Sequence, residues 1–223
     1  MSTRLFFEAI IKVILGIVIV GALIFLPAGT FEFWNGWLFM GLLFIPMIIA
    51  GFVLMFKNPE LLKRRLDNKE KVGTQKLVIL LSGLMFICGF VIAGLNYKYN
   101  WNSIPTIVVY IASGLFLLAY ILYAEVLREN TYLSRTVKVE EGQEVIDTGL
   151  YGIIRHPMYA ATILLFLMMP LVLGSIYSLI VFLLYPIIII VRINNEEKVL
   201  EEELKGYKEY KEKVKYRLLP YIW

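Results

Sequence analysis

Long apolar segments separated by short polar ones dominate the pattern of this chain. Six of them can be drawn, at residues 9–26, 34–56, 77–95, 104–123, 158–173 and 175–193. A helix of about 20 apolar residues spans the hydrocarbon of a bilayer, with a usable range of roughly 17–25. The first four segments fit this length, and the last two are shorter and meet at Gly174 and Ser175. The pattern predicts an all-α fold, a polytopic membrane bundle of about six transmembrane helices that ends in a helical hairpin.

The composition supports the membrane class. Hydrophobic residues make up 59% of the 223 positions, whereas a soluble domain contains roughly half. We expect one structural domain, made of N-terminal transmembrane helices at residues 1–125 and a core at 126–223 that holds a loop, the hairpin and the tail. The first apolar segment lacks a small-residue cleavage site and is read as a retained helix. Cys88 lies inside an apolar segment and is predicted to be a small buried hydrophobe.

Lysine and arginine are frequent in two connecting segments and in the tail, and they are sparse in the other connections. They are frequent at residues 57–76, 128–155 and 198–217, whereas residues 27–33 hold none and residues 96–103 hold only Lys98. Positive loops face the cytoplasm, so we expect six crossings with both termini and the polar loops on the cytoplasmic side. That membrane is the cell membrane if the source is a prokaryote. The basic segment 63–76 favours contact with anionic headgroups rather than with nucleic acid.

The tail is charged but compatible with helix. Residues 194–215 carry a loose apolar stripe among acids and lysines, which predicts a cytoplasmic amphipathic helix continuing out of the sixth span. Residues 217–223 form a short apolar end that we expect to fold back against the membrane face.

The candidate chemistry lies in the polar stretch 143–159, which holds the only histidine. Pro157 suits the first turn of a helix, whose unpaired N–H groups favour an anionic ligand group. His156 either binds a ligand or has a capping or structural role. Arg192 and Glu196 are four residues apart and share a helix face, either as a surface ion pair or as part of a site. A short hairpin would return them close to His156 and Tyr159, and facing ionisable groups at a membrane boundary are site candidates.

These residues resemble the isoprenylcysteine carboxyl methyltransferase family from about residue 136 onward. The motifs that carry the resemblance are Gly149-x-Tyr151, Arg155-His156-Pro157-x-Tyr159, Arg192-x-x-x-Glu196-Glu197, Tyr207-x-x-Tyr210-x-x-x-Val214 and Leu219-Pro220. Phospholipid N-methyltransferases share part of this pattern. Together the motifs are specific, although each alone would be weak.

The resemblance implies an integral-membrane enzyme that uses S-adenosylmethionine to methylate the carboxylate of a lipidated or isoprenoid substrate. It implies that Arg192 faces the substrate carboxylate as the catalytic and substrate-binding residue. The implied cofactor-binding residues are Gln143, Glu144, Val145, Ile146, Tyr151, His156, Pro157, Met158, Tyr159 and Glu196. Gln143 stands where better-known members carry a histidine. The implied partners are a prenylated or lipid-like small molecule or peptide and membrane lipids, without nucleic acid or metal.

The chemistry of methyl transfer agrees with this residue set. In-line displacement on a sulfonium needs alignment and exclusion of water more than acid–base help. The sequence shows no metal-ligand cluster, no Ser–His–Asp or Cys–His set and no glycine-rich nucleotide loop after a strand.

Other functions remain open. A phospholipid or other lipid-amine N-methyltransferase would need a base, for which Glu196 or Glu197 could serve, whereas Arg192 favours a carboxylate acceptor. A non-enzymatic transporter or scaffold would carry ionisable residues deep in several spans, and the second and third apolar segments have none in their interiors. A membrane reductase with a related helical core is a remoter option. In a cell that does not prenylate proteins, the acceptor would be a small isoprenoid or fatty acid.

Overall fold

The computed structural model describes residues 3–66, 73–134, 136–137, 139 and 141–223. These residues are helical or irregular, with no strand among them. The elements are α1 (Thr3–Ala28), α2 (Trp34–Lys57), α3 (Pro59–Leu66), α4 (Gly73–Tyr99), α5 (Thr106–Glu129), the 3-10 helix η1 (Gly149–Gly152), α6 (Pro157–Val172), α7 (Ile176–Phe182), α8 (Leu184–Glu203) and α9 (Tyr207–Lys213). The predicted all-α membrane bundle is confirmed.

Five helical segments of the described chain are long and apolar enough to cross a membrane, and α6 is a shorter apolar helix of 16 residues. The fifth of them, Ile176–Glu203, combines α7 and α8. They are separated at Leu183, and Pro186 follows in the first turn of α8, where proline is tolerated. The chain turns between α6 and α7 at Gly174, whose φ is +74°. Ser175 then caps α7 by accepting a hydrogen bond from the Ser178 N–H.

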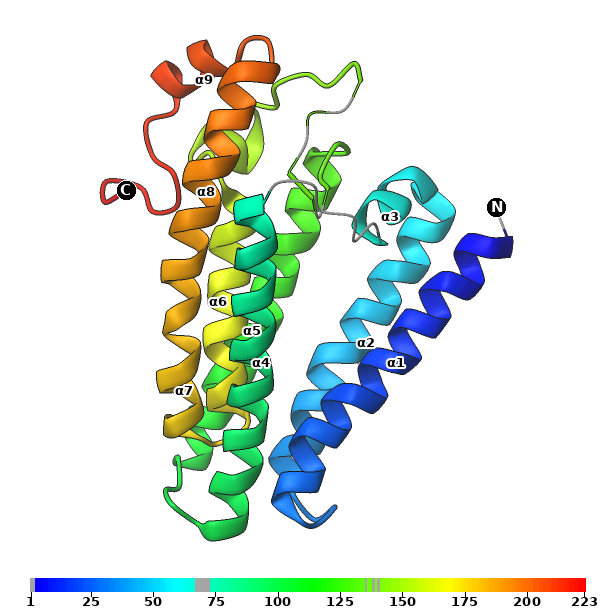
Figure 1. Cartoon of the computed structure of the whole chain (residues 1–223), viewed down its shortest axis with the longest axis vertical. Helices are drawn as coiled ribbons and strands as arrows, with labels where there is room; N and C mark the ends of the chain where they lie inside the picture. The colour runs from blue at the N-terminus through cyan, green and yellow to red at the C-terminus, as the bar shows by residue number, and fades with distance from the viewer. Residues whose placement is uncertain (1–2, 67–72, 135, 138, 140) are drawn as a thin grey trace.

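The helices form one bundle in which α4 is central, packing against α1, α7 and α8, while α5 packs along α6. Figure 1 shows α1 and α2 leaning away from the other long helices, and it shows α3, α9 and the start of α1 in the upper half of the view. Close approach depends on two glycines of α4. A Cβ on Gly89 would collide with the Phe182 ring, and one on Gly94 would collide with the Ile24 carbonyl oxygen.

Three sequence expectations need correction. Cys88 is exposed on α4 rather than buried, because an apolar side chain on the lipid-facing side of a span needs no protein cover. The segment 63–76 is not simply a basic loop, since α3 covers its first residues. Lys69 and Lys71 lie outside the described residues. The tail is not one continuous helix, because Gly206, at φ +87°, separates α8 from α9.

Residues 217–223 turn back on themselves, while their contact with the membrane face stays a prediction. The N–H groups of Arg217, Leu218 and Leu219 all donate to the Trp223 carbonyl oxygen, at 2.9, 2.9 and 3.1 Å. The Trp223 side chain packs against the main hydrophobic core. The division of the chain near residue 126 stays a prediction.

Candidate functional site

A cleft lies where the loop after α5 meets the start of α6 and the end of α8. Its empty volume is about 820 Å³, counting space open to solvent. The described residues that line it are Asn130, Tyr132, Leu133, Ser134, Thr136, Val137, Gln143, Glu144, Val145, Ile146, Tyr151, Arg155, His156, Met158, Tyr159, Arg192, Glu196, Leu200, Leu204, Tyr207 and Tyr210.

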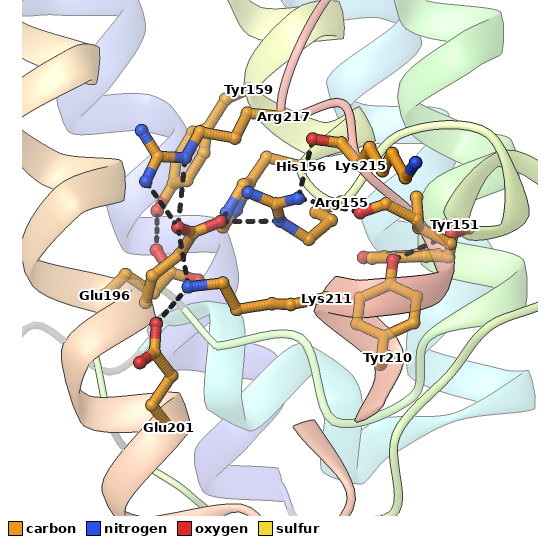
Figure 2. Close-up of polar contacts among 12 residues, drawn as sticks. Tyr151, Arg155, His156, Tyr159, Glu196, Glu201, Tyr210, Lys211, Lys215 and Arg217 are labelled. Carbon is orange, nitrogen blue, oxygen red and sulfur yellow. Dashed lines mark hydrogen bonds and ion pairs between the residues drawn. The ribbon is translucent and has the colours of Figure 1, made fainter. Parts of the chain in front are cut away.

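One wall of the cleft joins the two arms of the hairpin through Tyr159. The Arg192 Nε donates to the Tyr159 hydroxyl at 2.7 Å, and that hydroxyl donates to the Glu196 carboxylate. Tyr159 itself is buried. Arg192 and Glu196 therefore belong to one polar chain along the cleft, ordered by a tyrosine from α6, as Figure 2 shows for Tyr159 and Glu196. The return of the short hairpin to its starting point is confirmed.

Directly behind this wall, Glu197 is 2% exposed and accepts from several basic groups. The Arg155 Nε lies 2.8 Å and the His156 Nε2 lies 3.1 Å from its Oε1. The Arg217 Nη2 lies 2.9 Å and the Lys211 Nζ lies 3.9 Å from its Oε2. A buried carboxylate is tolerated only when it is paired and hydrogen-bonded in this way.

Glu197 thereby fixes the start of α6 to the tail. The Arg155 Nη1 donates to the Val214 and Lys215 carbonyls at 2.7 and 2.9 Å, contacts that are drawn around Arg155 in Figure 2. The backbone N–H groups of Arg155 and His156 donate to the Tyr216 and Arg217 carbonyls, both at 2.9 Å. These two N–H groups, which precede α6, bind the tail instead of facing a ligand.

The 3-10 helix η1 is held against the end of α5. The Glu129 carboxylate accepts from the Leu150 N–H at 3.1 Å, and the Asn130 amide donates to the Tyr151 hydroxyl at 3.0 Å. Gly149 has φ +51°, and a Cβ there would overlap the Glu129 carboxylate. Only glycine meets both the conformation and the space, which explains this glycine in the motif.

The short helix α9 closes the cleft from the tail side. Tyr207 and Tyr210 pack with Leu204 and Val214, and with Val145 from the loop. Burial raises the pKa of both tyrosines, so their hydroxyls stay protonated donors. The Tyr210 hydroxyl donates to the Tyr151 carbonyl at 2.7 Å. The Tyr207 hydroxyl is buried and has no hydrogen-bond partner among the described residues.

All but one of the site residues predicted from the sequence line this cleft. Pro157 does not; it is buried as the first residue of α6. His156 lines the cleft, but its side chain makes no capping hydrogen bond and its Nε2 faces Glu197, which supports the structural alternative. Glu197 lies behind the cleft, so the geometry does not support its suggested use as a base for an amine acceptor.

The sequence reasoning missed several contributors from outside the motifs. Asn130, Ser134 and Thr136 line the cleft before the polar stretch begins, and Leu200 of α8 and Leu204 just after it line the other side. The sequence carried one usable signal for Leu200 and Leu204, namely their helical spacing of four and eight residues from Glu196. The loop residues carried no such signal, because a segment without regular secondary structure has no periodicity in its sequence.

Part of the chain is similar to a known protein family. Residues 108–202 match the isoprenylcysteine carboxyl methyltransferase (ICMT) family. The match includes every predicted site residue and ends before α9. A search of curated proteins found no significant match.

Proposed function

We propose that this chain is an integral-membrane methyltransferase that transfers a methyl group from S-adenosylmethionine to the carboxylate of a lipidated or isoprenoid substrate, since residues 108–202 match the isoprenylcysteine carboxyl methyltransferase family. The observation that carries the proposal is the convergence of Tyr159, Arg192 and Glu196 on a single cleft. Tyr159 comes from α6, whereas Arg192 and Glu196 come from α8, so both arms of the hairpin contribute to one site.

The residues of the cleft suit the donor. When bound, S-adenosylmethionine supplies a methyl group on a cationic sulfur, and it also carries an ammonium, a carboxylate and hydroxyls. The Glu196 carboxylate offers an anionic partner for the cationic groups, and Val145, Leu200 and Leu204 offer apolar contact. The unpartnered Tyr207 hydroxyl is an expected contact for a polar ligand group, because burying such a group unpaired is costly.

Arg192 suits the acceptor. A guanidinium can hold a carboxylate through two parallel hydrogen bonds, which fixes its orientation. The bond from Arg192 Nε to Tyr159 fixes the plane of that fork. Tyr159 and Met158 line the same wall, and their rings and methylenes would exclude water from a bound acceptor, which strengthens electrostatic contacts there. The chain thus aligns and desolvates a nucleophile that is already ionised, and no proton needs to leave it.

We further propose that the cleft and both described chain ends face the cytoplasm. The support is the excess of lysine and arginine in α3, in the loop after α5 and in the tail. The donor is a water-soluble cofactor made inside cells, which favours the same side.

The test is methyl transfer by purified protein in liposomes. Methyl-labelled S-adenosylmethionine and a farnesylated cysteine analogue should yield a base-labile methyl ester. Arg192→Lys should lower turnover by at least about tenfold, because an ammonium cannot reproduce the planar fork. Arg128→Lys is the matched control, since this exposed arginine pairs with Glu125 away from the cleft.

Two outcomes would reject the proposal. Label found only in phospholipid amines would replace it with lipid-amine methylation. A protein that binds the donor but labels neither class would remove both acceptors.

A further inference from the structure

The helix α3 lies outside the family-matched segment, yet its Arg65 reaches the back of the cleft wall. The Arg65 Nη1 donates to the Ser134 carbonyl at 3.2 Å and lies 3.8 Å from the Met158 sulfur. Its Nη2 donates to the Tyr123 hydroxyl. Ser134 and Met158 both line the cleft, whereas Arg65 itself does not. One guanidinium therefore joins α5, the loop after it and α6 from behind.

The rest of α3 is built to hold Arg65 in place. Asn58 accepts from the Leu61 N–H at 3.1 Å through its side chain, and Pro59 starts the helix. Leu61 and Leu62 are buried at 1% and 5% exposure. At the other end, the Lys12 ammonium of α1 donates to the Leu66 carbonyl at 2.6 Å. This helix is fixed at both ends, so its arginines are presented at defined positions.

The neighbouring Arg64 strengthens the same junction. Its Nη1 donates to the Thr131 carbonyl at 2.7 Å, and its guanidinium lies 5.8 Å from the Tyr132 ring centre. The loop is also tied within itself, because the Ser134 hydroxyl accepts from the Thr136 N–H at 3.2 Å. Loop carbonyls that would otherwise turn freely are thus oriented by α3, and this loop forms one wall of the cleft.

We propose that Arg65 is a positioning residue for the methyl-donor site, acting through the Ser134 backbone and the Met158 side chain. This inference rests on the proposed function, since it takes the cleft to be the donor site. It gives the N-terminal half a role beyond membrane anchoring, because a residue outside the family-matched segment holds two residues of the wall from behind. Arg65 is half-buried and donates to the Ser134 carbonyl, whereas Lys63 on the same helix is exposed. Lys63 is therefore better suited than Arg65 to binding lipid headgroups.

The test compares Arg65→Lys with Lys63→Met in the full chain, reconstituted in nanodiscs with and without anionic lipid. Lysine keeps the charge but cannot bridge Tyr123 and Ser134 together, because it has no planar fork. Equilibrium binding of labelled S-adenosylmethionine should weaken about tenfold in Arg65→Lys. The KM for the farnesylated acceptor and the midpoint of thermal unfolding should stay near those of the wild type. Lys63→Met should change none of these quantities.

Each outcome decides the inference. A donor Kd within about twofold of wild type in Arg65→Lys would remove it, as would an equal loss in Lys63→Met. An effect seen only with anionic lipid would assign Arg65 to headgroup contact instead. A parallel loss of donor binding, acceptor KM and thermal midpoint would reduce Arg65 to a purely structural role. A wild-type chain that binds no donor would sink the proposed function itself, and this inference with it.

Discussion

Replacing Glu197 with glutamine removes one buried negative charge while keeping nearly the same shape. The side chain is 3% exposed, and it faces Arg155, His156 and Arg217 at 2.8–3.1 Å. The substitution leaves these basic groups without their carboxylate. It also loosens the side chain that orients two tail carbonyls, since Arg155 binds Val214 and Lys215 at the same time.

The size of the effect follows from burial. Removing one partner of a buried ion pair costs about 3–5 kcal/mol, because the remaining charge is left uncompensated. Glutamine keeps one acceptor oxygen, so we expect about 3–4 kcal/mol. For a chain of this length each kcal/mol lowers the unfolding midpoint by roughly 2–4 °C. Glu197→Gln should therefore lower it by roughly 6–16 °C.

Thermal unfolding in detergent, followed by intrinsic fluorescence, measures the midpoint. Hydrogen exchange adds a local readout, since the N–H groups of Arg155 and His156 should lose protection when their tail partners separate. The matched control is Glu196→Gln, one residue away and half-buried. Its amide oxygen can still accept from Tyr159, so we expect a loss of about 1 kcal/mol or less.

A double-mutant cycle sharpens the test. Glu197→Gln combined with Arg155→Gln should cost less than the sum of the single changes, by about 1–3 kcal/mol, because the two groups contact one another. The reasoning fails if Glu197→Gln unfolds within about 2 °C of wild type, or if Glu196→Gln falls equally far. Strict additivity in the cycle would show that the pair is not coupled.

Three further changes can be checked with the same assays. Gly149→Ala should destabilise the protein by at least about 1–2 kcal/mol, because its φ of +51° disfavours any side chain; unchanged stability would contradict this. Gly94→Ala should also lower the unfolding midpoint, since the new methyl meets the Ile24 carbonyl oxygen. The open site at Gly83 on the same helix should accept alanine with no loss, or with a gain of about 0.5–1 kcal/mol, and equal effects at the two sites would refute the packing argument. Tyr207→Phe should leave stability of the ligand-free protein unchanged but weaken donor binding by about 0.5–1.5 kcal/mol, measured by equilibrium binding; a stability loss without a binding loss would argue against a ligand contact.

The spans could be read from the sequence because the bilayer imposes a length and a polarity on each one. Their ends could not. The third predicted span, 77–95, became Gly73–Tyr99, since a helix continues past the hydrocarbon wherever its backbone bonds allow. The short helix α3 was hidden inside a run of basic residues. The sequence marked it only locally, by Asn58-Pro59 at its start and by the adjacent leucines Leu61 and Leu62, which the structure buries.

The candidate site could be predicted where residues repeat at helical spacing or cluster in a short loop. Arg192 and Glu196 were found in this way, and both line the cleft. Contacts between segments far apart in the chain produce no recognisable pattern in the sequence. Arg65 meets Ser134 and Met158 across 69 and 93 residues of chain, and a single arginine in a basic segment looks like any other.

The adjacent carboxylates Glu196 and Glu197 show why one motif serves two purposes. Successive residues on a helix point about 100° apart, and here this turn directs the two carboxylates to different partners. Glu196 points to Tyr159 and the cleft, while Glu197 points to Arg155, Arg217 and the tail. The first carboxylate is thereby available to a ligand, and the second joins the start of α6 to the chain that closes over it. Changes at Glu196 should thus be seen in donor binding, and changes at Glu197 in the stability of the junction that holds the cleft together.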